Sequence, residues 1–130
     1  MKFLLDTSSI IWAVSNPNQL SERGRKILSN PESEIQVSPM SCAEIACAVE
    51  RGRLQLDRHW KIWFRHFVDV NGWDVVPIDL PVIEEAYSLP EPFHRDPSDR
   101  ILVATSRLYR STLLTSDQKI LNYPHVDSVW

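Results

Sequence analysis

The sequence predicts an α/β domain built on a mostly parallel central sheet of about five strands, with helices on both faces. Short apolar runs such as Phe3-Leu4-Leu5 alternate along the chain with stretches of helical periodicity. Such runs are typical of buried parallel strands, and the joints between them are short. The chain has 130 residues, of which 43% are apolar and 24% charged, so we expect a single domain over residues 1–130.

Two strands and three helices are expected in the N-terminal half of the chain. They are strand 2–5, helix 8–15, helix 22–29, strand 34–38 and helix 42–51. Ser21 stands where a serine side chain would cap the second helix. Gly52 follows the third helix and provides a stop signal, because glycine readily adopts the left-handed conformation that ends helices.

The C-terminal half is expected to alternate in the same way. Its elements are helix 57–70, strand 74–78, helix 81–88, helix 97–110, strand 112–115, a helical turn at 118–121 and strand 126–129. Asn71-Gly72 ends the first helix. Pro77 predicts that strand 74–78 lies at a sheet edge or ends there, because proline cannot donate to a strand ladder. Pro90 and Pro92 predict a loop before the helix that begins at Pro97.

Composition excludes several classes of protein. No apolar stretch approaches the ~18 residues that span a bilayer, and the first apolar run breaks at Asp6, too early for a signal peptide. We therefore expect a cytoplasmic protein without a membrane contact. Cys42 and Cys47 lack the spacing of a zinc or redox motif. The net charge of −3 gives no overall basic field, although arginines and lysines bunch locally.

Four acidic residues stand at the ends of predicted strands or at the starts of the helices that follow. They are Asp6, Glu44, Asp99 and Asp117. Ligand sites in parallel sheets lie beyond the carboxyl ends of the strands, so these acids are expected to converge. Four carboxylates at one edge would repel each other without a cation. Because carboxylate oxygens are hard ligands, the ion predicted is Mg²⁺ or Mn²⁺.

Each acid also has a purely structural interpretation. Residues 41–44 fit a capping box, residues 96–99 fit an N-cap followed by proline, and Asp6 and Asp117 could each cap the helix that follows. Capping explains each acid singly, whereas a metal site explains why all of them fall at one edge. The sequence favours the metal site and leaves capping open.

Four ordered segments resemble the signature segments of PIN-domain ribonucleases. They are LLDTS at 4–8, CAEIA at 42–46, HRDPSDRILVAT at 94–105 and LTSD at 114–117. The third segment and the overall length resemble in particular the VapC-type toxins of bacterial toxin–antitoxin pairs. The resemblance covers essentially the whole chain and implies a PIN-like three-layer fold. One departure is Ser8, where relatives often carry Asn or His.

The resemblance implies a Mg²⁺- or Mn²⁺-dependent endoribonuclease. Its acidic quartet would be Asp6, Glu44, Asp99 and Asp117, with Asp6, Asp99 and Asp117 as the main metal ligands and Glu44 on a metal or the attacking water. Residues expected to orient the ligands, or to add a ligand, are Asp96, Thr7, Thr115 and Ser116. His94 is expected to be structural, because it lies in a loop beside a helix start.

The resemblance also implies partners. These are an RNA substrate, a second copy of the chain in a homodimer, and a VapB-type antitoxin whose C-terminal segment fills a groove and brings a basic side chain to the acids. Arg95 and Arg100 are candidates for contacts with RNA phosphate or antitoxin. Trp60 and Trp63, on an unusually apolar helix, are candidates for the groove, although that helix face could equally belong to the core.

Two other classes of protein share some of these features. A receiver-like signalling domain also carries an acidic Mg²⁺ site, but it needs a lysine after a late strand, where this chain has Ser116-Asp117. A haloacid-dehalogenase-like phosphatase needs a second aspartate two residues after Asp6, where Ser8 stands. A non-catalytic PIN-like RNA- or protein-binding module is a further alternative, which the complete acidic set disfavours.

Overall fold

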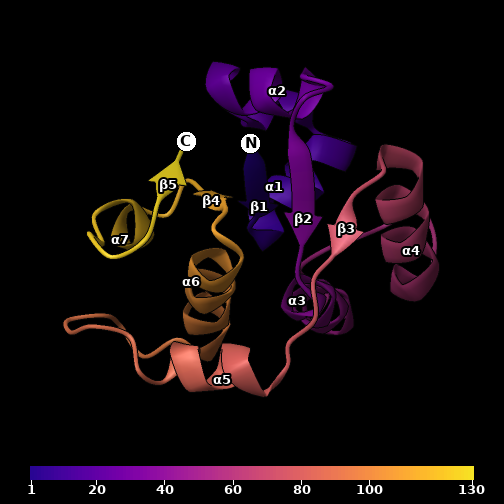
Figure 1. The fold of residues 1–130 in the computed structure, drawn as a ribbon. Coiled ribbons are helices and arrows are strands. Elements are labelled where there is room, and N and C mark those ends of the chain that lie inside the picture. The colour runs from indigo at the N-terminus through magenta and orange to yellow at the C-terminus, as the bar shows by residue number, and fades with distance from the viewer.

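The computed structural model describes residues 1–130 and is built on a five-stranded, entirely parallel sheet (Figure 1). The strands are β1 (Lys2–Leu5), β2 (Glu34–Val37), β3 (Asp74–Val75), β4 (Thr112–Leu114) and β5 (Ser128–Val129). Their order across the sheet is β3-β2-β1-β4-β5, so β1 pairs with β2 on one side and with β4 on the other. The predicted α/β class with a parallel sheet is confirmed.

Seven α-helices and one 3₁₀ helix connect and cover the strands. The α-helices are α1 (Thr7–Ser15), α2 (Glu22–Ser29), α3 (Pro39–Glu50), α4 (Trp60–Asn71), α5 (Leu80–Ala86), α6 (Pro97–Tyr109) and α7 (Gln118–Leu121), and the 3₁₀ helix is η1 (Pro17–Gln19). In Figure 1, α2 lies above the sheet, α4 to the right and α5 below. None of these helices has the length and apolar character needed to cross a membrane.

The two faces of the sheet carry separate apolar clusters, as expected from alternating side chains in a strand. Phe3 and Leu5 of β1 pack with residues of α1, α3 and α4, among them Ile45. Leu4, between them, belongs to the cluster on the other face with Leu102 of α6 and others. The sheet is therefore the middle of three layers.

Helix boundaries follow the capping residues. The side chain of Ser38 accepts a hydrogen bond from Met40 N, and Pro39 occupies the first helical turn, so α3 begins three residues earlier than predicted. Gly72 has a φ of 66° and ends α4 in the left-handed conformation, as predicted. Strand β3 is shorter than predicted and lies at the edge of the sheet, in keeping with Pro77.

Helix α4 differs from its prediction in two ways. It begins at Trp60 rather than Asp57, because the His59 side chain caps it by accepting a hydrogen bond from Lys61 N. Trp63 is only 2% exposed and packs in the core, as does Phe64. The structure therefore corrects the interpretation of Trp63 as a surface contact, and Trp60, which is half-buried, is the tryptophan that remains accessible.

The burial of α4 predicts different costs for its two tryptophans. We expect Trp63→Ala to lower the free energy of unfolding by about 3–5 kcal/mol, because it leaves a large cavity in the core. Trp60→Ala, the matched control one turn earlier, should cost less than about half of that. Urea unfolding followed by circular dichroism measures both. Equal losses would contradict the assignment of Trp63 to the core.

Candidate active site

The four acids predicted from the sequence lie at the carboxyl edge of the parallel sheet. Asp6 directly follows β1, and Asp117 follows β4 and precedes α7. Glu44 lies in α3, the helix that follows β2, and Asp99 lies in the first turn of α6. Four elements far apart in sequence therefore each bring one carboxylate to the same edge.

Asp6 and Asp117 each cap the helix that follows them. Oδ1 of Asp6 accepts a hydrogen bond from Ser9 N at 2.8 Å, and Oδ1 of Asp117 accepts one from Lys119 N at 2.9 Å. The backbone N–H of Asp6 also donates to the carbonyl of Leu114 at 3.2 Å, which joins the end of β1 to the end of β4. Capping occupies one oxygen of each carboxylate and does not compete with a ligand bound through the other.

Glu44 is not a capping residue. Helix α3 is capped by Ser38, so Glu44 lies well inside the helix, and the capping-box interpretation of residues 41–44 is wrong. Its Oε1 instead accepts a hydrogen bond from the Thr7 hydroxyl at 2.5 Å, and the Thr7 oxygen lies 3.0 Å from the Ser41 hydroxyl. Thr7 therefore orients Glu44 across the gap between α1 and α3.

Asp99 experiences the strongest electrostatic perturbation of the group. Burial, and then the negative charges of its acidic neighbours, raise the pKa of Asp99 to about 7. Those neighbours are Asp96, Asp117, Glu44 and Asp6. Burial is also the main cause that raises the pKa of Asp6 and of Glu44. The raised pKa of Asp99 means that its negative charge is costly unless a cation balances it.

No lysine or arginine supplies that balancing charge. The Lys and Arg ion pairs of the molecule are Lys26–Glu22, Arg58–Asp57 and Arg107–Glu85, none of which involves the four acids. Ligand atoms of Asp99, Asp117 and His94 lie within 4.8 Å of one another. Clustered carboxylate oxygens without a lysine or arginine partner fit a divalent cation.

His94 lies close to the acids. Its Nε2 atom lies 3.1 Å from Oδ2 of Asp99, so the loop histidine reaches the acids. The only signal in the sequence was its position two residues before Asp96 in the same segment, and a loop position alone does not reveal the direction of a side chain.

The auxiliary residues have varied positions. Asp96 caps α6 by accepting a hydrogen bond from Ser98 N at 2.9 Å. Thr115 is buried and its hydroxyl accepts from Asp117 N at 3.0 Å, while Ser116 beside it is half-buried. Arg95 is exposed. These positions suit Thr115 and Asp96 for holding the loops that carry the acids.

Arg100 is occupied with the protein itself. Its guanidinium donates to the carbonyls of Ala86 and Phe93 at 3.1 and 3.3 Å, and it lies over the rings of Tyr87 and Phe93. These contacts disfavour Arg100 as a residue that binds RNA phosphate or antitoxin. It fixes the loop before α6 instead.

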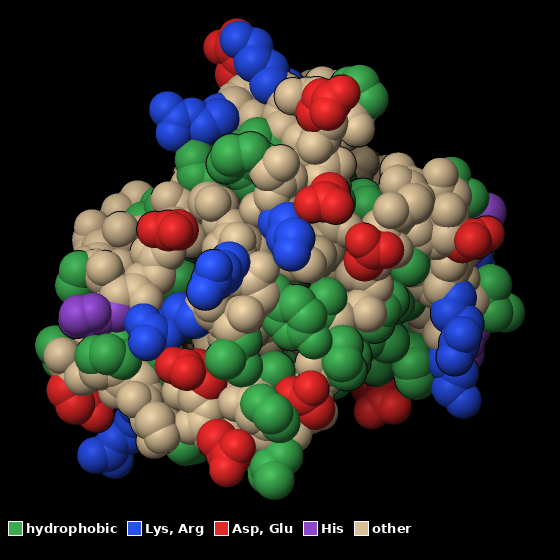
Figure 2. All heavy atoms as spheres, in the orientation of Figure 1, with side chains coloured by type: hydrophobic (Ala, Val, Ile, Leu, Met, Phe, Trp, Pro, Cys, Tyr) green, Lys and Arg blue, Asp and Glu red, His purple; other side chains and the backbone are tan.

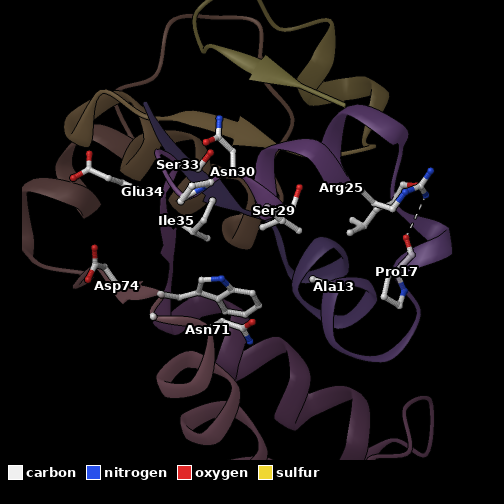
Figure 3. Close-up of a pocket in the computed structure, with 15 residues that line it drawn as sticks. Ala13, Pro17, Arg25, Ser29, Asn30, Ser33, Glu34, Ile35, Asn71 and Asp74 are labelled. Atoms are coloured by element: carbon white, nitrogen blue, oxygen red, sulfur yellow. Dashed lines mark hydrogen bonds between the residues drawn. The ribbon is translucent and has the colours of Figure 1, made fainter.

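A hollow lies at the opposite edge of the sheet from the acids (Figure 3). Glu34 and Asp74, where β2 and β3 begin, stand on its rim, and none of the four acids lines it. Arg25, the arginine in this hollow, is hydrogen-bonded to the carbonyls of Pro17 and Leu20. The hollow therefore has no part in the chemistry of the acids.

Charged side chains of both signs are interspersed on the face shown in Figure 2, with no single basic patch. Hydrophobic side chains gather there between β3 and α4. A groove with apolar walls runs between α3 and α4, lined by Pro39, Cys42, Trp60, Phe64, Val68 and Val75 together with Lys61 and Arg65. Cys42 and Glu44 share α3 but lie about 200° apart around its axis, so the groove and the acidic cluster face different sides of that helix.

The raised pKa of Asp99 predicts how stability depends on pH without metal. Between pH 4 and 7 the folded protein retains a proton that the unfolded chain has lost, so stability falls as pH rises through this window. Asp99→Asn should therefore raise Tm in EDTA by about 3–6 °C at pH 8 and by much less at pH 4.5. Thermal unfolding at both pH values tests this, with the exposed Asp69→Asn as control. A gain of the same size at both pH values would contradict it.

Comparison with known proteins agrees with this geometry. The chain is 28% identical over 123 residues to Ribonuclease VapC22 of Mycobacterium tuberculosis, covering 94% of this chain and 92% of the relative. Similar folds occur in the crystal structure of VapBC2 from Rickettsia felis bound to a promoter DNA fragment (13% identity, 99% and 98% covered, TM-score 0.73). They also occur in FitAcB from Neisseria gonorrhoeae (20% identity, 98% and 96% covered, TM-score 0.67).

The family model of the PIN domain matches residues 3–126, from the first strand to the loop before the last. This match spans all four acids and nearly the whole three-layer fold. The chain therefore belongs to the PIN domain family.

Proposed function

We propose that this protein is a metal-dependent endoribonuclease of the VapC type, the toxin of a toxin–antitoxin pair. The observation that carries the proposal is the convergence of four carboxylates from β1, α3, α6 and the end of β4, with the pKa of Asp99 raised to about 7. The similarity to Ribonuclease VapC22 supports the choice of RNA as substrate. The whole chain, residues 1–130, acts as one domain in this proposal.

Asp6, Asp99 and Asp117 would hold the metal, and Mg²⁺ or Mn²⁺ is the ion that suits their oxygen ligands. A bound divalent ion polarises the scissile phosphate and stabilises the charge that develops on the leaving oxygen. The residues of this chain position the remaining participants. Thr7 fixes the direction of Glu44, whose carboxylate orients the attacking water or adds a ligand.

Loop anchoring keeps this arrangement in register. The hydrogen bond from Asp6 N to the carbonyl of Leu114 ties together the two loops that carry Asp6 and Asp117. The bond from Asp117 N to the Thr115 hydroxyl fixes the second loop further. Such supporting contacts hold metal ligands in a geometry that they could not keep alone.

The partners follow from the same proposal. RNA would approach the carboxyl edge of the sheet, where Arg95 is exposed. The groove between α3 and α4 is the candidate seat for a segment of a VapB-type antitoxin, since it is apolar and carries the basic residues Lys61 and Arg65. We further propose that the protein is a homodimer. Exposed apolar side chains such as Leu80 and Tyr87, on and next to α5, would be buried at the dimer interface.

The proposal predicts RNA cleavage that requires both the metal and the acids. Purified protein should cut a labelled total-RNA pool with Mg²⁺ or Mn²⁺ and stop in EDTA. Asp99→Asn should lower the rate about 100-fold or more, because it weakens metal binding where transition-state charge develops. Asp69→Asn, an exposed aspartate on α4, is the matched control and should cut at the wild-type rate.

Metal-independent cutting that survives Asp99→Asn would contradict the proposed mechanism. Absence of cutting by folded, antitoxin-free protein across pools from several growth conditions would favour the alternative, a PIN-like module that binds RNA or protein without cleaving. Mapping the cut ends would identify the target RNA.

A further inference from the structure

The loop that carries His94 is anchored beside the acids by hydrogen bonds and ring contacts. Arg100 donates to the carbonyl of Ala86, where α5 ends, and to the carbonyl of Phe93, next to His94. The Tyr123 hydroxyl donates to the carbonyl of Pro90 in the same loop. The Phe93 ring packs on Tyr123 with ring centres 4.5 Å apart, and on His94 at 4.4 Å. The position of the His94 imidazole is therefore set by its packing on Phe93 and by the hydrogen bonds that neighbouring residues make.

The Nε2 atom of His94 is buried and makes no hydrogen bond. It lies 3.1 Å from Oδ2 of Asp99, which satisfies the distance for an ion pair. The short distance is not a hydrogen bond, because an N–H on Nε2 would not point at the carboxylate. A buried nitrogen this close to a carboxylate oxygen, yet out of line for a hydrogen bond, needs another partner.

The spacing of the polar atoms fits a shared ion. Ligands bound at ~2.1 Å in an octahedral site lie about 3 Å apart when adjacent and about 4 Å apart when opposite. The separation of 3.1 Å between Nε2 and Oδ2 matches an adjacent pair. Asp117 contributes an oxygen within 4.8 Å of both, so small side-chain movements bring the three atoms onto one ion.

We propose that His94 is a nitrogen ligand of the catalytic metal site, beside Asp99 and Asp117, and that it makes the site prefer Mn²⁺ over Mg²⁺. The inference rests on the proposed function, since it adds a ligand to the same site. Imidazole nitrogen binds first-row transition ions well, whereas Mg²⁺ is bound mainly by oxygen. The site would then be a mixed nitrogen and carboxylate site rather than an all-oxygen one.

Pulsed electron paramagnetic resonance of the Mn²⁺-loaded protein tests this directly. The electron spin of bound Mn²⁺ should show coupling to an imidazole ¹⁴N nucleus, which changes when the protein is made with ¹⁵N-histidine. The coupling should persist in His125→Gln, which alters an exposed histidine, and should vanish in His94→Gln. The labelling arm uses the wild-type chain, so it does not depend on a variant that folds.

Metal affinities provide the second readout. His94→Gln should raise the Kd for Mn²⁺ about 10-fold or more and the Kd for Mg²⁺ by less than about threefold. Bound Mn²⁺ without nitrogen coupling, or equal losses for both ions, would overturn the role of His94 and leave the proposed nuclease intact. A wild-type protein that binds no Mn²⁺ would overturn the ligand role together with the proposed metal site.

Discussion

Repulsion among carboxylates at the end of a parallel sheet is the constraint on which the site depends. Parallel pairing brings all the carboxyl ends of the strands to one edge, so acids that follow different strands meet there whatever their separation in sequence. Burial adds to their mutual repulsion, and together these effects raise the pKa of Asp99 to about 7. The fold tolerates this cost because the acids are anchored individually, Asp6 and Asp117 as helix caps and Glu44 through Thr7.

The strand order explains where the acids meet. The chain builds outward from β1 in one direction through β2 and β3, and then returns to add β4 and β5 on the other side. The crossovers that leave β1 and β4 therefore diverge, which opens a crevice at the point where ligands bind in open α/β sheets. Asp6 and Asp117 lie on the two sides of this crevice. The hydrogen bond from Asp6 N to Leu114 O joins the ends of β1 and β4 between them. The topology thus brings the acids to one edge, and the loops that follow β1 and β4 orient Asp6 and Asp117 there.

Periodicity and capping predicted the type and order of nearly every element, because strands buried on both faces and amphipathic helices leave clear local patterns. The strand order was not predictable in this way, since it depends on contacts between distant segments. The cap also determines whether Glu44 can be a capping residue. Helix α3 is capped by Ser38 and begins at Pro39 rather than after Ser41, so Glu44 lies inside the helix. The burial of Trp63, the internal contacts of Arg100 and the approach of His94 to Asp99 were not predictable for one shared reason, namely that a sequence does not show which way a side chain points.

The pKa of Asp99 is the quantity that tests the account most directly. Carbon-13 NMR of labelled aspartate side chains, assigned with Asp99→Asn, would follow its titration with and without Mg²⁺ or Mn²⁺. We expect a pKa of about 7 in metal-free protein and a clear fall in that pKa when the ion binds. A pKa near 4 that metal does not change would contradict it, because the acids would then neither repel each other nor share a cation.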